Sequence, residues 1–142
     1  MAEGAKDIKM DEAAKPIIMI VEDDPDLAKI LSLQLSTEGF GIAVADNGAS
    51  AYDLIQDLCP DCIILDLMMP VMDGFSFLKR LRSLKHTQDV PVIVLTASED
   101  ERHKRKSHQY LADAFVKKPY NLQELTQLVQ RLLNEATSET VN

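Results

Sequence analysis

The sequence lacks the features of a membrane-spanning or secreted protein and of a protein that coats nucleic acid. No stretch is long and apolar enough to cross a bilayer. The first fifteen residues carry acids and lysines around no apolar segment, so they form no secretory signal, and we expect a cytoplasmic protein. Basic residues are few, and the formal net charge of -8 argues against non-specific binding to nucleic acid.

Cysteine is scarce as well, with only Cys59 and Cys62. A thioredoxin-like pair follows a strand and opens a helix, whose N-terminus lowers the pKa of a thiol. Here the order is reversed, because Cys59 closes a helical pattern and Cys62 begins a strand. A zinc site needs further ligands, and His103 and His108 offer them only on an unusual spacing. We expect both cysteines to be small buried hydrophobes, and redox activity stays open.

The sequence does contain enough apolar residues for one globular domain. Its 142 residues are 46% hydrophobic and 27% charged, which is ordinary for a soluble protein with a sizeable core. No internal repeat and no change of composition marks a second domain. We expect a flexible leader over residues 1–15, one domain over residues 16–135 and a short polar tail over residues 136–142.

Short apolar runs alternate with helical patterns along this domain. The runs, bounded by turn residues, predict buried strands over 17–21, 40–45, 62–66, 90–95 and 112–116. Apolar residues at helical spacing predict helices over 25–38, 49–58, 74–84 and 121–134. Such alternation indicates an α/β fold, a five-stranded parallel sheet with helices on both faces. With right-handed crossovers, we expect the flavodoxin-like strand order 2-1-3-4-5.

One more helix should begin at the capping box of Ser98 to Glu101. Its body, Arg102 to Gln109, contains no apolar residue, and helices that are polar all round are marginal. We expect it to be the least stable element of the fold.

The chain is organised around Asp66, which ends a very apolar strand. A lone carboxylate there is costly to bury unless another group compensates it. All strands of a parallel sheet end on one edge, so residues that follow the other strands should meet Asp66 there. Those residues are Glu22, Asp23, Thr96 and Lys118.

This set of side chains suits the transfer of a phosphoryl group. Three clustered carboxylates are stable together only when protonated or bound to a cation, and oxygen ligands suit Mg²⁺. Lys118 would supply a positive charge and Thr96 a hydroxyl. Asp66 could then attack a phosphoryl group in line, without a general base, because its carboxylate is already deprotonated at neutral pH.

Taken singly, each of these residues has a simpler explanation. Asp24 fits the N-cap of the first helix, and Asp73 fits a turn before Gly74. Thr96 alone would only end a strand, and Lys118 alone would be a solvated charge. Their joint placement is what favours a functional site.

Four segments form a pattern that no single one of them would define. They are Val21-Glu22-Asp23-Asp24, Ile64 to Gly74, Leu95-Thr96-Ala97 and Lys118-Pro119. Together they resemble the CheY-like receiver domain of two-component response regulators, over roughly residues 16–134.

The resemblance implies a phosphoacceptor switch. Asp66 would accept a phosphoryl group from the phosphohistidine of a sensor histidine kinase or a histidine phosphotransfer protein. Asp23 and Asp66 would bind Mg²⁺ directly, with Glu22 acting through water and the backbone carbonyl of Met68 as a further ligand. Such a protein is no enzyme for a separate substrate, because it catalyses only its own phosphorylation and slow autodephosphorylation.

The resemblance also implies how phosphorylation is read. Thr96 would move to bond a phosphoryl oxygen while Phe115, the switch aromatic, turns inward. The new dianion would thereby bias a two-state element. The bond between Lys118 and Pro119 matches one that is usually cis in the family.

The predicted fourth helix departs from the family pattern. Apolar residues are usual near Arg105 and His108, and a Gly-Ala pair usually stands where this chain has Leu111-Ala112. Leucine disfavours the left-handed cap that glycine allows, so this helix end should be reshaped. The basic run from Arg102 to Lys106 is either a docking patch or a solvated face.

We predict a stand-alone receiver that signals through protein contacts, since no DNA-binding or catalytic domain follows Asn134. It would bind no DNA directly, lie on no membrane, and act as a monomer or a phosphorylation-linked dimer with an unnamed downstream protein. The alternative is a receiver-like interaction module that is not phosphorylated. A haloacid-dehalogenase-like phosphatase fits less well, because that family places an acid two residues after the nucleophile, where this chain has Met68.

Overall fold

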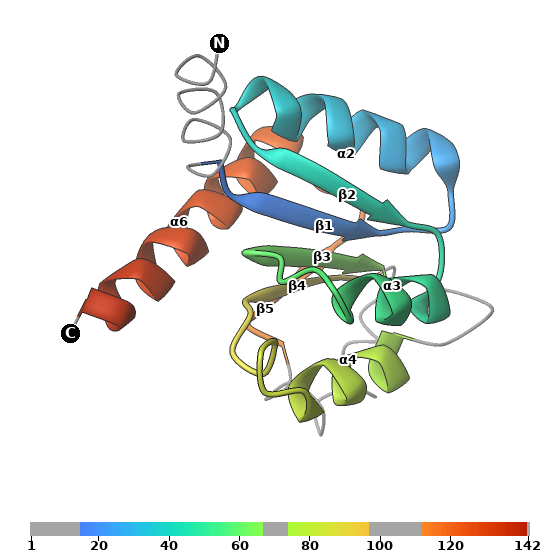
Figure 1. Ribbon diagram of the computed structural model, residues 1–142. Coiled ribbons are helices and arrows are strands. Elements are labelled where there is room, and N and C mark those ends of the chain that lie inside the picture. Colours follow the sequence, from blue (N-terminus) through green and yellow to red (C-terminus); the bar gives the residue numbers. More distant parts are fainter. Residues whose placement is uncertain (1–14, 67–73, 97–111, 142) are drawn as a thin grey trace, which may run out of the picture.

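The computed structural model describes residues 15–66, 74–96 and 112–141. Strands and helices alternate along the chain, as the sequence predicts (Figure 1). They are β1 (Ile17–Val21), α2 (Pro25–Thr37), β2 (Gly41–Ala45), α3 (Gly48–Ile55), β3 (Cys62–Asp66), α4 (Gly74–Ser83), β4 (Val92–Thr96), β5 (Ala114–Lys117) and α6 (Leu122–Val141). The predicted helix over Arg102 to Gln109 lies outside the described residues.

The strands form one parallel sheet in the order β2-β1-β3-β4-β5, which confirms the predicted α/β fold and strand order. Helices α2 and α6 cover one face of the sheet, and α3 and α4 cover the other (Figure 1). The order reverses between β1 and β3, and in such sheets ligands bind beside the carboxyl ends of the strands at that point.

Each face of the sheet has its own hydrophobic core. Ile18 and Ile20 pack with the residues of α2 and α6, while Met19 and Val21 pack with those of α3 and α4. Successive side chains of a strand point to opposite faces, so a strand covered on both sides must be apolar throughout. This explains why the strands appear in the sequence as uninterrupted apolar runs.

Three ends of the described helices are capped, including the predicted cap at Asp24. The Asp24 carboxylate accepts hydrogen bonds from the backbone N–H groups of Asp26 and Leu27, at 2.9 and 3.4 Å. Gly39 ends α2 with a φ of 93°, a left-handed conformation that glycine adopts without strain. The Asn121 side chain accepts from the N–H of Glu124 at 3.0 Å at the start of α6. Asp24 is therefore a cap, in line with its simpler explanation.

Three details differ from the sequence-based expectations. Helix α6 continues to Val141 and takes in most of the predicted polar tail, because no glycine or proline interrupts the chain after Leu122. In α4 the buried aromatic residue is Phe77, while Phe75, whose spacing from Leu78 and Leu81 favours the inner face of the helix, is only partly buried. Strand β5 begins at Ala114, two residues late.

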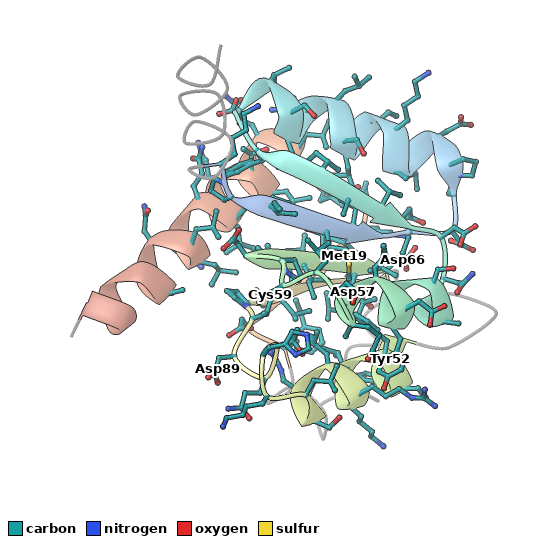
Figure 2. The ribbon with its side chains drawn as sticks, in the orientation of Figure 1. Met19, Tyr52, Asp57, Cys59, Asp66 and Asp89 are labelled. Carbon is teal, nitrogen blue, oxygen red and sulfur yellow. The ribbon has the colours of Figure 1, made fainter. Side chains whose placement is uncertain are left out.

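The two cysteines differ in burial, contrary to the prediction that both are buried. Cys62 is buried in β3, and this burial raises the pKa of its thiol to about 12, so it stays protonated. Cys59 is exposed in the loop before β3 (Figure 2), where its thiol donates to the carbonyl of His86 at 3.1 Å. Both thiols are free.

Across the described residues, no helix combines the length and the apolar character needed to cross a membrane.

Candidate functional site

The sheet brings Asp66 to the edge where the sequence predicts a site. Asp66 is the last residue of β3 and lies beside Leu95 of β4 (Figure 2). Its side chain is buried, with 3% of the residue exposed. Glu22 and Asp23 follow β1, whose last residue, Val21, pairs with Leu65. Neighbouring parallel strands thus place Asp66 beside Glu22 and Asp23, although more than forty positions separate it from them in the sequence.

The three carboxylates form one cluster. Glu22, Asp23 and Asp66 each offer an oxygen, and these oxygens lie within 4.8 Å of one another. Glu22 is almost fully buried, whereas Asp23 is exposed. Burial first, and then the hydrogen bond and the charge of Asp66, raise the pKa of Glu22 to about 8. The cluster therefore disfavours the ionised form of Glu22 when no cation is bound.

The donor set fits Mg²⁺. One oxygen of Glu22, Oε2, accepts from the N–H of Asp24 at 3.2 Å. The other, Oε1, is buried and has no hydrogen-bond partner among the described residues. A buried carboxylate oxygen that lacks a partner is costly, and a hard cation satisfies it. Mg²⁺ prefers oxygen ligands to nitrogen or sulfur, and it commonly binds one or two carboxylates and keeps several waters. The backbone carbonyl of Met68, the fourth predicted ligand, lies outside the described residues.

Lys118 lies against the buried acid. Its Nζ donates to Oδ2 of Asp66 at 2.9 Å, and its backbone N–H donates to the carbonyl of Thr96 at 2.7 Å. Burial alone would lower the pKa of Lys118, but the hydrogen bond and charge of Asp66, with the charge of Glu22, outweigh it and raise the pKa. Lys118 therefore carries a positive charge at neutral pH. The Lys118–Pro119 peptide bond is cis, as the resemblance predicts.

The predicted switch residues lie on β4, which is next to β3, and on β5, which is next to β4. Thr96 is fully buried at the end of β4, and its partner in register is Lys117 of β5. Phe115 pairs with Val94 and packs, partly buried, against the core beneath α3 and α4. The structure thus brings both residues onto adjacent strands, and their movement on phosphorylation stays a prediction.

Comparison with known proteins decides the family. The family model of the response regulator receiver domain matches residues 18–130. This chain belongs to that family. The resemblance carried by the four sequence segments is therefore confirmed, together with the fold.

The receiver domain resembles both curated relatives and solved structures. It is 36% identical over 118 residues to the DNA-binding dual master transcriptional regulator RpaA of Synechocystis, covering 83% of this chain and 49% of the relative. The chain thus spans about half the length of the curated relatives it matches. The receiver domain of a signal transduction histidine kinase from Syntrophus aciditrophicus is 35% identical, with a TM-score of 0.78 over 84% of this chain and 91% of that one.

A third similar protein was solved with ligands. The response regulator TrrA of Thermotoga maritima, in complex with Mg(2+)-BeF, is 32% identical. The match has a TM-score of 0.73 and covers 82% of this chain and 98% of that one.

Sequence reasoning missed one residue of this receiver's site. Tyr120 is half-buried two residues after Lys118, and burial and the charge of Glu22 raise the pKa of its hydroxyl. The negative charge of the acid cluster thus disfavours ionisation of this hydroxyl. Its position just after the Lys-Pro pair was the only signal in the sequence.

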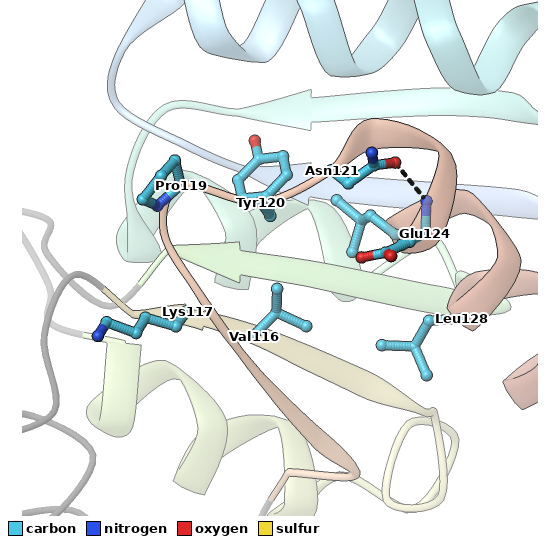
Figure 3. A pocket seen from close by; sticks show the side chains of 8 residues that line it. Val116, Lys117, Pro119, Tyr120, Asn121, Glu124 and Leu128 are labelled. Atoms are coloured by element: carbon cyan, nitrogen blue, oxygen red, sulfur yellow. Dashed lines mark hydrogen bonds between the residues drawn. The ribbon is translucent and has the colours of Figure 1, made fainter.

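A separate cavity of about 320 Å³ opens on the other side of Tyr120, between β5 and the start of α6. Figure 3 shows Pro119 and Tyr120 above it and the hydrogen bond from Glu124 to Asn121 at its rim. None of the three clustered acids lines it. The acid cluster is therefore separate from this cavity.

Proposed function

We propose that this receiver accepts a phosphoryl group on Asp66 from the phosphohistidine of a histidine kinase or a phosphotransfer protein. The observation that supports it best is the buried Asp66 carboxylate, which has Lys118 Nζ at 2.9 Å and two further carboxylates within 4.8 Å. Phosphoryl transfer to a carboxylate is favoured by positive charge beside the nucleophile, which Lys118 supplies, and by acids that can hold a metal ion next to it.

In the proposed reaction an oxygen of Asp66 attacks phosphorus in line. The new O–P bond forms as the P–N bond to the donor imidazole breaks, and the leaving nitrogen keeps the bonding electrons. Lys118 already faces Asp66, so it can donate to a phosphoryl oxygen without a large movement. The hydroxyl of Thr96, at the end of the next strand, would donate to another after the group has arrived.

Glu22, Asp23 and Asp66 would hold Mg²⁺, with the Met68 carbonyl as a further ligand. When bound, this cation would offset the charge that the acids and the phosphoryl group bring together. The complex of TrrA with Mg(2+)-BeF supports this assignment by similarity. The unpartnered Oε1 of Glu22 supports it independently, from this chain alone.

The proposed output is a change in protein contacts. The phosphoryl group would place about two negative charges next to Thr96, where the Asp66 carboxylate carried one, which biases the strand ends between two arrangements that include Phe115. DNA binding is stated for RpaA, of which this chain matches only 49%, and we do not extend it to the receiver. The cytoplasmic location stays a prediction.

The test is chemical phosphorylation. Incubation with Mg²⁺ and acetyl phosphate should add one phosphoryl group, seen in the intact mass, and chelation with EDTA should prevent it. The variant Asp66→Asn should gain none. Asp57→Asn, which changes an exposed acid that is not part of the cluster, should be labelled like the wild type. Equal labelling of Asp66→Asn would contradict the assignment of Asp66 as the phosphoacceptor. No labelling of the wild type would contradict the proposal and favour a receiver-like module that is not phosphorylated.

A further inference from the structure

Strand β2 lies at an open edge of the sheet (Figure 1). Within the described part of the chain it pairs only with β1. The N–H of Gly41 donates to the carbonyl of Pro16 at 2.9 Å, and the carbonyl of Ala45 accepts from the N–H of Glu22 at 3.0 Å. The backbone groups of Gly41 and Ala45 therefore point toward β1.

The backbone groups between them point the other way. Peptide groups alternate along a strand, so the N–H and C=O groups of Ile42 and Val44 face away from β1. An edge of this kind can accept a further strand unless charge, proline or a bulge blocks it. The β2 sequence, Gly-Ile-Ala-Val-Ala, contains neither a charged residue nor a proline.

A groove of about 560 Å³ runs beside this edge. Val44, Ala45 and Asp46 line it from β2, and Ser50, Asp53 and Leu54 line it from α3. Val44 and Ala45 point to opposite faces of the sheet, so the groove passes around the edge and does not lie under one face. Val44 is 46% exposed and Leu54 37%, which are high values for large apolar side chains.

The charges of the groove indicate what it would bind. Asp46 and Asp53 are both exposed, and neither is in an ion pair with any other described residue. The β2 strand of a second copy contains no basic residue that could offset the charge of these two aspartates. A basic segment would instead meet opposite charges on an apolar surface.

We propose that the β2 edge and its groove dock an extended basic segment of a partner protein. The segment would pair with the backbone of Ile42 and Val44 as an added strand, the mode by which sheet edges bind peptides. Its apolar side chains would cover Val44 and Leu54. Lysine or arginine side chains would lie beside Asp46 and Asp53. The proposal does not depend on phosphorylation of Asp66.

Amide hydrogen exchange measured by NMR tests this directly. In the free protein the N–H groups of Ile42 and Val44 should exchange faster than those of Ala43 and Ala45, which point to β1. Two end-blocked synthetic peptides of equal length serve as probes, one of alternating lysine and valine and one of alternating glutamate and valine. The lysine peptide should slow exchange at Ile42 and Val44 several-fold, and the glutamate peptide should not.

Variants separate the charge from the strand pairing. Asp46→Lys combined with Asp53→Lys should reverse the preference, so that the glutamate peptide gives the slower exchange. Val44→Lys, a charge on the edge itself, should abolish the effect of the lysine peptide. Asp57→Lys, an exposed acid outside the groove, should behave as the wild type.

Several results would overturn the proposal. If neither peptide slows exchange, the edge does not bind an added strand. If both peptides slow exchange equally, the charge of the groove does not select the partner. Protection at Ile42 and Val44 that grows with protein concentration, with a dimer in sedimentation, assigns the edge to a second copy. Protection at every concentration without peptide means that the chain covers its own edge.

Discussion

Raising the pH without a divalent cation should destabilise this receiver through Glu22. The carboxyl group is 2% exposed and faces Asp66. Burial and Asp66 raise its pKa from an ordinary 4.5 to about 8 in the folded protein. Between these two values the folded protein holds a proton that the unfolded chain has lost. The free energy of unfolding must therefore fall as the pH rises through this window.

The size of the effect follows from the two pKa values. One pH unit within the window is worth about 1.4 kcal/mol, so the whole difference corresponds to an upper limit of roughly 5 kcal/mol. Water that enters with the ionised group lowers this, and we expect a loss of roughly 2–4 kcal/mol from about pH 5 to pH 8. That is a large share of the stability of a small domain, which is about 5–15 kcal/mol.

Urea unfolding followed by circular dichroism measures this loss. Wild type and Glu22→Gln are compared in EDTA across the pH window. The glutamine is close in shape and cannot ionise, so its stability should change much less with pH and should exceed that of the wild type at pH 8. Mg²⁺ at pH 8 should restore the wild type more than the variant, because it binds the ionised carboxylates. The variant Asp57→Asn, which alters an exposed acid, should keep the slope of the wild type.

Two results would refute this reasoning. One is a wild type in EDTA that is equally stable at both ends of the window. The other is a Glu22→Gln variant that loses stability in parallel with the wild type, since the slope would then come from another group.

Two further substitutions test the site and the core. Lys118→Met removes the cation 2.9 Å from Asp66. We expect labelling by acetyl phosphate to slow about a hundredfold and the free energy of unfolding to fall by roughly 1–3 kcal/mol. The exposed control Lys79→Met should change neither. Labelling of Lys118→Met at the wild-type rate would contradict the role of Lys118. Phe77→Ala opens a cavity at a fully buried position and should cost about 3–5 kcal/mol in urea unfolding. The exposed control Leu33→Ala should stay within about 0.5 kcal/mol, and equal losses in both variants would show that Phe77 does not support the core.

The sheet and the site could be predicted because their signals are local or follow from parallel strands alone. Apolar runs without alternation require cover on both faces, and this establishes a parallel sheet with helices on each side. Once the sheet is parallel, Glu22, Asp66, Thr96 and Lys118 must meet at one edge, however far apart they are in sequence. Caps such as Asp24 were predictable for the same reason, since the donor and acceptor lie within one turn.

Other features depended on packing between distant segments. Both Phe75 and Phe77 fit a helical pattern, and contact with the core of α3 and α4 decides which one is buried. The two cysteines differ in burial because one lies within a central strand and the other in a loop against His86. No sequence pattern distinguishes these cases.

The sequence by itself determined the fold through its apolar runs, and it indicated the family and the candidate acid Asp66 through the residue types at the strand ends. Only the tertiary structure decided the electrostatic state of that site. It buried one oxygen of Glu22 without a hydrogen-bond partner among the described residues, and it brought the ammonium group of Lys118 into a hydrogen bond with Asp66. It also decided that, within the described residues, β2 pairs only with β1 and lies beside Asp46 and Asp53, which form no ion pair there. These features depend on distances between segments far apart in the chain, which only packing sets.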